Sequence, residues 1–249
     1  MPKLKVLLTG AGGRVGRHLV GPFQEQYDLR TLDRRRVPGD PNAVLADLQD
    51  FPALKAAMKD IDVAVHLAAT PDEAPFVENL VPNNVVGLYN VFQAALEAKV
   101  RRIVFASTCQ TVLGQPWDHT ISIADPVRPC SMYGATKVFG EALGRFYHER
   151  HKMQFVGIRI GAFQAYDSPH LLKSSGTRAL WLSPRDAVSL FRRAIEKENV
   201  GYALVFGTSI TEWELLSRKE AKELLDYEPQ DDVVKLCGPV RKGKDGRTQ

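Results

Sequence analysis

Short apolar runs alternate with amphipathic stretches along the first 160 residues of the chain. The apolar runs are almost continuous in Val, Leu, Ile and Ala, which predicts strands that are buried on both faces. These predicted strands cover residues 4–9, 28–32, 43–46, 62–67, 102–107 and 155–160. The stretches between them repeat their apolar side chains at helical spacing and predict helices over residues 14–26, 51–58, 84–98 and 131–149. Such alternation predicts an α/β fold with a doubly wound, Rossmann-like parallel sheet.

This alternation weakens after residue 161. Residues 162–183 read as an irregular segment that contains Gly, Ser and Pro. Beyond them, the pattern predicts helices over 185–197 and 218–225 and a strand over 203–206. We therefore expect a main body over residues 1–161, a small C-terminal substrate-capping lobe over 162–240 and a disordered tail over 241–249.

Composition excludes several classes of protein. With 44% hydrophobic and 25% charged residues and a net charge of +4, the 249-residue chain has an ordinary globular balance. Its basic tail carries no nucleic-acid-binding motif, and no apolar run approaches the roughly 18 residues of a membrane span. The three cysteines, Cys109, Cys130 and Cys237, have neither disulfide nor metal spacing. We expect a cytoplasmic protein that binds no nucleic acid, membrane or metal.

A glycine-rich turn joins the first predicted strand to the first predicted helix. It places Gly10, Gly13 and Gly16 three residues apart, with Arg14 and Val15 between the last two. Glycines let the backbone approach a pyrophosphate closely, and a helix N-terminus offers free N–H groups to it. The position between a strand and a helix therefore predicts that the main body binds a dinucleotide.

An acidic residue follows the second predicted strand. Asp33 lies seventeen residues after Gly16, close to the spacing at which a carboxylate binds the adenosine ribose hydroxyls. A carboxylate there repels a 2′-phosphate and favours NAD. The triplet Arg34–Arg36 comes next, and an arginine at this place accepts a 2′-phosphate, so NADP remains open. More residues at strand ends are candidates for cofactor contact: Asp47, Leu48, Leu67, Ala68 and Ala69.

Tyr133 and Lys137 form a candidate proton-transfer pair. Their spacing of four places them on one face of the predicted helix that follows the fifth strand. An ammonium near a phenol stabilises the phenolate and lowers its pKa, so the phenol can exchange a proton with a substrate hydroxyl. Thr108, at the end of the fifth strand, supplies a hydroxyl for the same substrate oxygen. Two neighbouring elements thus deliver three reactive groups beside the expected cofactor.

Together these motifs resemble the extended short-chain dehydrogenases, also called the NAD-dependent epimerase/dehydratase family, over about residues 4–230. Within the family the chain looks most similar to uronate dehydrogenases. The resemblance implies oxidation of a sugar's anomeric hydroxyl to a lactone by NAD, with Tyr133 as the base, Lys137 as its tuner and ribose ligand, and Thr108 as the hydroxyl partner. It also implies cofactor contacts at Asn84 and Ile160, and a homodimer formed through the helices that carry Asn84 and Tyr133.

The chain differs from the family at the positions that are expected to contact the substrate. The family tends to carry Asn-His where this chain has Cys109-Gln110, and serines where it has Pro71 and Ala162. Arg178 is the candidate for the family arginine that clamps a carboxylate. The expected substrate contacts are Thr70, Cys109, Gln110, Ala162 and Arg178. Fewer polar groups leave fewer hydrogen-bond donors for a uronate. The resemblance therefore supports the hydride-transfer reaction more strongly than it supports a particular substrate.

Two other functions stay open at this point. A nucleotide-sugar epimerase or dehydratase would return the hydride before release, but the chain after Ile160 looks short for a full substrate domain. A non-catalytic, redox-sensing dinucleotide binder would not need the Tyr133/Lys137 pair. A dehydrogenase acting on a sugar or sugar acid fits the motifs best.

Overall fold

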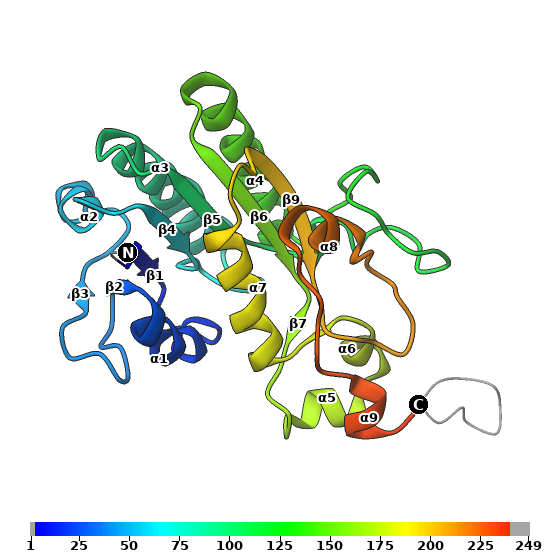
Figure 1. Cartoon of the computed structure of the whole chain (residues 1–249). Helices are drawn as coiled ribbons and strands as arrows, with labels where there is room; N and C mark the ends of the chain where they lie inside the picture. The colour runs from blue at the N-terminus through cyan, green and yellow to red at the C-terminus, as the bar shows by residue number, and fades with distance from the viewer. Residues whose placement is uncertain (1–2, 240–249) are drawn as a thin grey trace.

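Seven parallel strands form the main sheet of the computed structural model, which describes residues 3–239 (Figure 1). Their order across the sheet is β3-β2-β1-β4-β5-β6-β9, and every neighbouring pair is parallel. The strands are β1 (Lys5–Thr9), β2 (Asp28–Asp33), β3 (Val44–Leu45), β4 (Val63–His66), β5 (Arg102–Thr108), β6 (Gln154–Ile160) and β9 (Tyr202–Gly207). The predicted doubly wound parallel sheet is confirmed.

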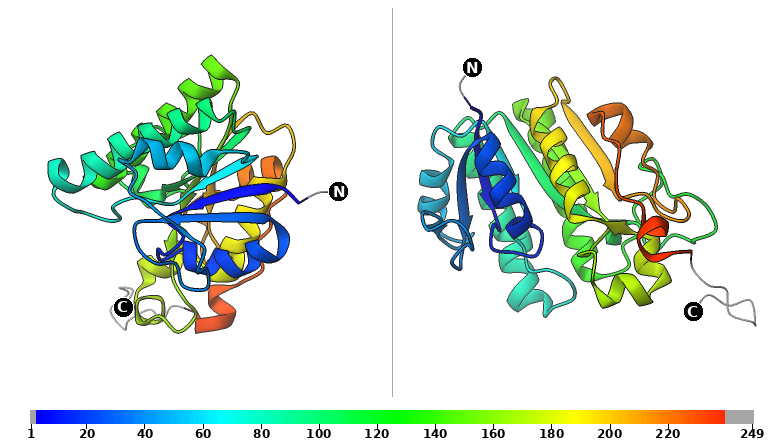
Figure 2. Two further views of the ribbon diagram at one scale, coloured as in Figure 1. Left: turned by 90° about the vertical axis from the view of Figure 1, so that its left-hand side faces the viewer. Right: turned by 60° about the horizontal axis from the view of Figure 1, so that its bottom comes forward.

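Helices cover both faces of this sheet (Figures 1 and 2). One face carries α1 (Gly16–Gln26) and α7 (Pro184–Glu196), and the other carries α2 (Phe51–Met58), α3 (Leu88–Glu97) and α4 (Met132–His151). Successive strand residues point to opposite faces. Leu8 therefore packs in the core under α1 and α7, whereas Leu7 packs in the core under α2 and α3. This two-sided burial explains the continuous apolar runs of the sequence.

The predicted helix over residues 84–98 begins differently in the structure. Residues Phe76–Gly87 form a π-helix, η1, which runs directly into α3. The apolar spacing of a sequence reveals α-helices through their 3.6-residue period and carries no comparable signal for the wider i→i+5 turn. The start of this helical segment was therefore misplaced, and with it the orientation of the residues just before α3.

The region after residue 161 divides differently from the expected lobe. β9 joins the main sheet beside β6, and α7 packs against α1. The segment expected to be irregular instead holds four short elements: β7 (Ala162–Phe163), α5 (Pro169–Lys173), α6 (Ser175–Ala179) and β8 (Trp181–Leu182). They are too short to show a period in sequence. With α9 (Val233–Cys237) they gather at the end of the molecule to which the strands' carboxyl ends point, while α8 (Lys219–Leu225) lies beside β9 (Figure 1).

Three expectations from the sequence concern the C-terminal tail, membrane-spanning helices and the cysteines. The tail over residues 241–249, expected to be disordered, lies outside the described residues. Within residues 3–239, no helix has the length and apolar character needed to cross a lipid bilayer. The three cysteines are free thiols: Cys109 is buried, Cys130 is exposed and Cys237 is intermediate.

Arg102 fastens the sheet to the C-terminal end of α7. Its side chain is fully buried at the start of β5 and donates to the backbone carbonyls of Ala194 at 2.9 Å and Ile195 at 2.8 Å, and also to that of Lys197. The last carbonyls of a helix have no partner within it and carry a partial negative charge. The guanidinium satisfies both needs where water has no access.

Replacing Arg102 with Met should lower the free energy of unfolding by about 2–4 kcal/mol, because buried carbonyls lose their donors. Urea denaturation followed by circular dichroism measures this change. The matched control is Arg101→Met at the exposed neighbouring position, which should stay within about 0.5 kcal/mol of the unaltered protein. Equal losses in the two variants would contradict the anchoring role.

Candidate active site

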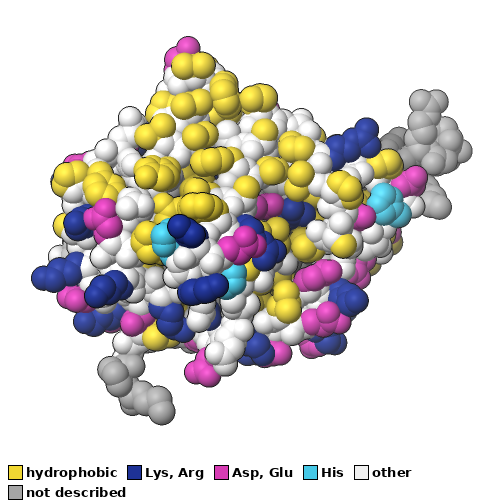
Figure 3. Space-filling view, turned by 90° about the horizontal axis from the view of Figure 1, so that it is seen from above, with side chains coloured by type: hydrophobic (Ala, Val, Ile, Leu, Met, Phe, Trp, Pro, Cys, Tyr) yellow, Lys and Arg dark blue, Asp and Glu magenta, His cyan; other side chains and the backbone are white. Residues whose placement is uncertain are grey.

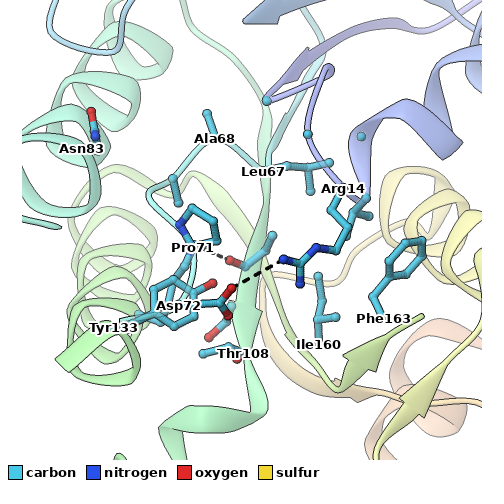
Figure 4. Close-up of a pocket in the computed structure, with 18 of the residues that line it drawn as sticks. Arg14, Leu67, Ala68, Pro71, Asp72, Asn83, Thr108, Tyr133, Ile160 and Phe163 are labelled. Atoms are coloured by element: carbon cyan, nitrogen blue, oxygen red, sulfur yellow. Dashed lines mark hydrogen bonds and ion pairs between the residues drawn. The ribbon is translucent and has the colours of Figure 1, made fainter. Parts of the chain in front are cut away.

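A cleft of about 610 Å³ opens at the carboxyl ends of the strands. Residues that end or follow β1, β2, β4, β5 and β6 line it, and Figure 4 shows the part around Tyr133 and Thr108. The strand order reverses between β1 and β4, since β2 lies on one side of β1 and the next crossover lies on the other. In doubly wound sheets a ligand binds in the crevice at such a reversal.

The glycine-rich turn forms the floor of this cleft. Gly10 has a φ of +72°, and a Cβ there would lie 2.5 Å from the backbone nitrogen of Ala68. A Cβ on Gly16 would lie 2.3 Å from the carbonyl oxygen of Gly10. Glycine at these two positions lets the ends of β1 and β4 approach each other and brings the N-terminus of α1 against the cleft. The free N–H groups of that N-terminus suit a pyrophosphate.

Asp33 lies buried at the end of β2, beside the glycine-rich turn. Its carboxylate accepts hydrogen bonds from the backbone N–H groups of Gly12 and Arg35, both at 3.0 Å. These bonds fix the carboxylate at the cleft, and an ionised carboxylate has further acceptor positions for ribose hydroxyls. Arg34 and Arg35 also line the cleft, next to this carboxylate. The turn, the helix N-terminus and the acid together fit a dinucleotide.

The start of α4 brings the reactive side chains to the end of β5. Ser131 caps the helix by accepting from the backbone N–H of Gly134 at 2.8 Å, and its hydroxyl donates to the Gln110 side chain at 2.5 Å. One turn apart on α4, Lys137 Nζ lies 5.6 Å from the centre of the Tyr133 ring. Thr108 ends β5 beside them (Figure 4). The expected convergence of these three residues is therefore present in one cleft.

Burial controls the ionisation of this group. It lowers the pKa of Lys137 to about 7, against the opposing effect of Glu141. It raises the pKa of Tyr133, and the carboxylate of Asp72 adds to that increase. The expected lowering of the Tyr133 pKa by Lys137 is not seen in the free cleft, where Lys137 Nζ donates to the Ala106 carbonyl at 2.8 Å. Desolvation disfavours a lone phenolate and a lone ammonium alike.

Beneath the reactive pair lies a buried ion pair between Glu141 and Arg159. The guanidinium of Arg159 donates to both carboxylate oxygens of Glu141, at 2.9 Å and 2.8 Å, and Ser107 Oγ donates to the same carboxylate at 2.6 Å. All three side chains are almost fully buried. This cluster ties α4 to β5 and β6 and places a negative charge one helical turn below Lys137.

Most of the residues that the sequence nominated line this cleft. On the cofactor side they are Gly10, Gly13, Arg14, Val15, Gly16, Asp33, Arg34, Asp47, Leu48, Leu67, Ala68, Ala69 and Ile160. On the reactive side they are Thr108, Cys109, Gln110, Tyr133, Lys137 and Ala162. Burial raises the pKa of the Cys109 thiol to about 12, which makes it an uncharged part of the wall.

Three nominated residues do not line the cleft. Asn84 lies behind the wall, where its side-chain amide binds the backbone N–H and carbonyl of Thr70 at 2.8 Å and 3.0 Å. Thr70 also lies behind the wall of the cleft, and its hydroxyl accepts a hydrogen bond from the Asn83 side chain at 2.8 Å. The guanidinium of Arg178 donates to the carbonyls of Leu171, Cys237 and Gly238. It is occupied in joining α5 to the segment that ends α9, so we leave it out of the substrate site.

Other lining residues escaped the sequence analysis. The polar ones are Asp72, Asn83, Ser107 and Gln164. Asn83 lies in the π-helical segment, whose wider turn no apolar spacing reveals. Gln164 follows the short strand β7. Asp72 could have been predicted from the sequence, because it comes three residues after Ala69. A loop that leaves the carboxyl end of a strand lies at the edge of such a sheet where ligands bind.

Comparison with known proteins agrees with the fold and with the expected family and cofactor. The NAD dependent epimerase/dehydratase family model matches residues 6–167. The NAD-dependent glucose-6-phosphate dehydrogenase of Haloferax volcanii is 35% identical over 93% of this chain and 95% of its own length. The L-arabinose 1-dehydrogenase (NAD(P)(+)) of the same organism is 32% identical over 92% and 97%. The solved uronate dehydrogenase of Agrobacterium tumefaciens has a TM-score of 0.85 and 30% identity over 94% of this chain and 87% of that chain.

Replacing Glu141 with Gln should move the pKa of Lys137 below its value of about 7, because the carboxylate that favours the ammonium is lost. A pH titration by NMR of protein with isotope-labelled lysine side chains measures this pKa directly. Glu149→Gln, at an exposed position of the same helix, is the control and should leave it unchanged.

Glu141→Gln also leaves the buried guanidinium of Arg159 without its carboxylate partner, and an unpaired buried charge strongly destabilises the fold. The double variant Glu141→Gln/Arg159→Gln removes that charge as well and should show the same fall in the Lys137 pKa. An unchanged titration in a folded variant would show that Glu141 serves packing alone.

Proposed function

The chain belongs to the NAD-dependent epimerase/dehydratase family, and on that premise we propose that it is a dehydrogenase that oxidises the anomeric hydroxyl of a sugar or sugar derivative to a lactone with NAD. One observation carries this proposal: Thr108, Tyr133 and Lys137 converge in the same cleft as the glycine-rich turn and Asp33. Relatives that match over nearly their full length are named as sugar dehydrogenases. They favour net hydride transfer over the epimerase and redox-sensor alternatives.

Each reactive residue has a defined task in this proposal. Oxidising a hydroxyl to a carbonyl removes one proton from oxygen and one hydride from carbon. Tyr133 acts as the phenolate, which the ammonium of Lys137 stabilises before the transfer. It takes the proton and becomes the neutral phenol, while Thr108 holds the substrate oxygen in place. Bound NAD supplies the nicotinamide carbon that accepts the hydride. The short distance from Lys137 Nζ to the Tyr133 ring, 5.6 Å to its centre, supports this division of roles.

Asp33 supports the choice of NAD over NADP. Two backbone N–H groups hold its carboxylate in place, and we infer that a 2′-phosphate would lie against it. Arg34 and Arg35 line the same end of the cleft and offer partial compensation for such a phosphate. We therefore propose NAD as the preferred cofactor and NADP as a weaker one.

We propose that the substrate is covered by the short elements at the carboxyl ends of the strands. Gly161, Ala162, Phe163 and Gln164 line the cleft at β7, and Leu180 lines it just before β8. This group, which comprises β7, β8, α5, α6 and α9, is smaller than the lobe expected over residues 162–240. Its small size leaves a pocket suited to a free sugar.

The face made by η1, α3 and α4 supports a homodimer. Figure 3 shows hydrophobic side chains gathered over one side of the molecule. The exposed large hydrophobic residues of these three elements are Phe76, Val77, Val86, Tyr89, Met132, Phe139 and Phe146. An apolar surface of this size marks an interface more often than a free face. We propose that two copies pair through it, in the cytoplasm, where the three free thiols would stay reduced.

Purified protein should reduce NAD when given an aldose, which absorbance at the NADH wavelength records. Tyr133→Phe should lower kcat by about a hundredfold or more, because the proton acceptor is lost. Isothermal titration should show that this variant still binds NAD. Tyr89→Phe loses a hydroxyl on an exposed face and should remain active. Activity surviving in Tyr133→Phe would refute the assigned base.

Phe146→Glu should convert a dimer to a monomer, since it places a charge in the proposed apolar interface. Phe146 is 55% exposed, so the folded protomer tolerates the change. Sedimentation velocity measures the assembly state. Leu172→Glu on α5, a position 49% exposed at the other end of the molecule, is the control and should stay dimeric. An unaltered protein that sediments as a monomer would reject the dimer.

A further inference from the structure

Asp72 places a carboxylate at the lip of the cleft, over its reactive end. It follows Pro71 in the loop after β4 and has a φ of 59°, in the left-handed region that Asp and Asn tolerate. Figure 4 shows its side chain beside Tyr133 and Thr108, directed toward Arg14 from the glycine-rich turn. The Arg14 guanidinium lies 3.5 Å from the carboxylate, and both side chains are more than half exposed.

The reactive end of the cleft has a simple charge pattern. Its walls around Thr108 and Tyr133 include the following residues: Pro71, Asp72, Asn83, Ser107, Cys109, Gln110, Leu113, Lys137, Gly161, Ala162, Gln164 and Leu180. Among these described residues, Asp72 is the exposed one that carries a charge, and the other ionisable amine or carboxyl, Lys137, is buried. The other charged groups of the cleft are assigned elsewhere: Asp33, Arg34, Arg35 and Asp47 lie at the ends of β2 and β3, and Arg14 lies on the glycine-rich turn.

The cations around this end already have partners. Arg14 is paired with Asp72 itself at 3.5 Å, so its guanidinium is not free for a substrate anion. Lys137 is buried, and its ammonium donates to the Ala106 carbonyl while it faces Tyr133. Arg178, the residue that the sequence nominated as a carboxylate clamp, is 9% exposed and donates to three backbone carbonyls of the capping elements. A carboxylate or phosphate on the substrate would therefore find no unpaired cation at this end and would approach the carboxylate of Asp72.

Asp72 also acts on the reacting group itself. After burial, its carboxylate is the next largest cause of the raised pKa of Tyr133, and the guanidinium of Arg14 opposes that increase. A charge that reaches the Tyr133 hydroxyl also reaches a sugar bound against that hydroxyl, because the field falls only gradually over a few ångströms. The neutral amides of Gln110, Asn83 and Gln164 offer both donors and acceptors, which is the chemistry that sugar hydroxyls need.

We propose that the substrate is a neutral aldose, and that Asp72 disfavours sugar acids and sugar phosphates by like-charge repulsion. This inference rests on the proposed dehydrogenase activity and makes it more specific. The named relatives differ on this point, since one is a glucose-6-phosphate dehydrogenase and another an L-arabinose dehydrogenase. For this chain, the carboxylate of Asp72 at the reactive end favours an uncharged sugar as the substrate.

Steady-state rates on matched sugars test the proposal. D-glucose is compared with D-glucuronate and D-glucose 6-phosphate, and D-galactose with D-galacturonate, each with saturating NAD and the full-length protein. The neutral member of each set should have a kcat/KM higher by about tenfold or more, because like charges at a binding site penalise the wrong ligand. Raising the salt concentration should increase kcat/KM for the anions alone, since salt screens exposed charges.

Asp72→Asn isolates the carboxylate. Asparagine accepts the left-handed backbone of this position, so the loop keeps its shape. The variant should narrow the neutral-over-anionic preference by about threefold to tenfold. Asp60→Asn is the matched control, because Asp60 is also exposed with a φ of 61° but lies outside the cleft, and it should keep the original preference.

The outcomes separate the two proposals. If no sugar, neutral or charged, leads to NADH, the dehydrogenase function itself is refuted. If NADH forms but faster with the acids or the phosphate than with their neutral partners, the function stands and the neutral-aldose inference is overturned. If neutral sugars are preferred equally by Asp72→Asn and Asp60→Asn, the role given to Asp72 is overturned.

Discussion

The buried ion pair between Glu141 and Arg159 is the interaction on which the reactive end of this protein depends. Removing two charges from water costs several kcal/mol per ion, and the attraction between them offsets this cost only with good hydrogen-bond geometry. Here Arg159 donates to both carboxylate oxygens, and Ser107 adds a third bond. In return, the side of α4 that carries Lys137 and Tyr133 is fixed against β5 and β6. A hydrophobic contact would not set the rotation of the helix so strictly.

That fixed rotation explains how two groups that burial disfavours can work together. Taken alone, the phenolate of Tyr133 and the ammonium of Lys137 are both penalised by desolvation. As a pair they attract each other strongly in the same low-dielectric setting, so charge separation between them costs less than either charge alone. The carboxylate of Glu141 favours the ammonium partner. The cleft therefore holds a buried phenol and a buried amine one helical turn apart, and burial opposes the charged form of each.

The sequence predicted the sheet and most of the cofactor half because these depend on local rules. Apolar runs marked the strands, and Gly10 and Gly16 are required where two backbones nearly touch. It failed where geometry is set by tertiary contacts. The π-helical turn before α3 brings Asn83 to the cleft and leaves Asn84 behind it. Arg178 had the right residue type for a clamp, but the carbonyls of the capping elements hold its guanidinium. No spacing rule could reveal either result.

The contrast between local rules and tertiary contacts also distinguishes the cofactor half of the cleft from the substrate half. The cofactor half is built from strand ends and a turn whose backbone positions leave little freedom, so it keeps one form while side chains elsewhere change. The substrate half is built from loops and elements of two to five residues, where a single exchange alters the charge without disturbing the sheet. Asp72 illustrates this freedom, because it lies in a loop whose backbone makes no strand contacts at that position. In our proposal, side-chain charge at the lip of the cleft therefore selects the sugar, and the sheet beneath it positions the groups for hydride transfer.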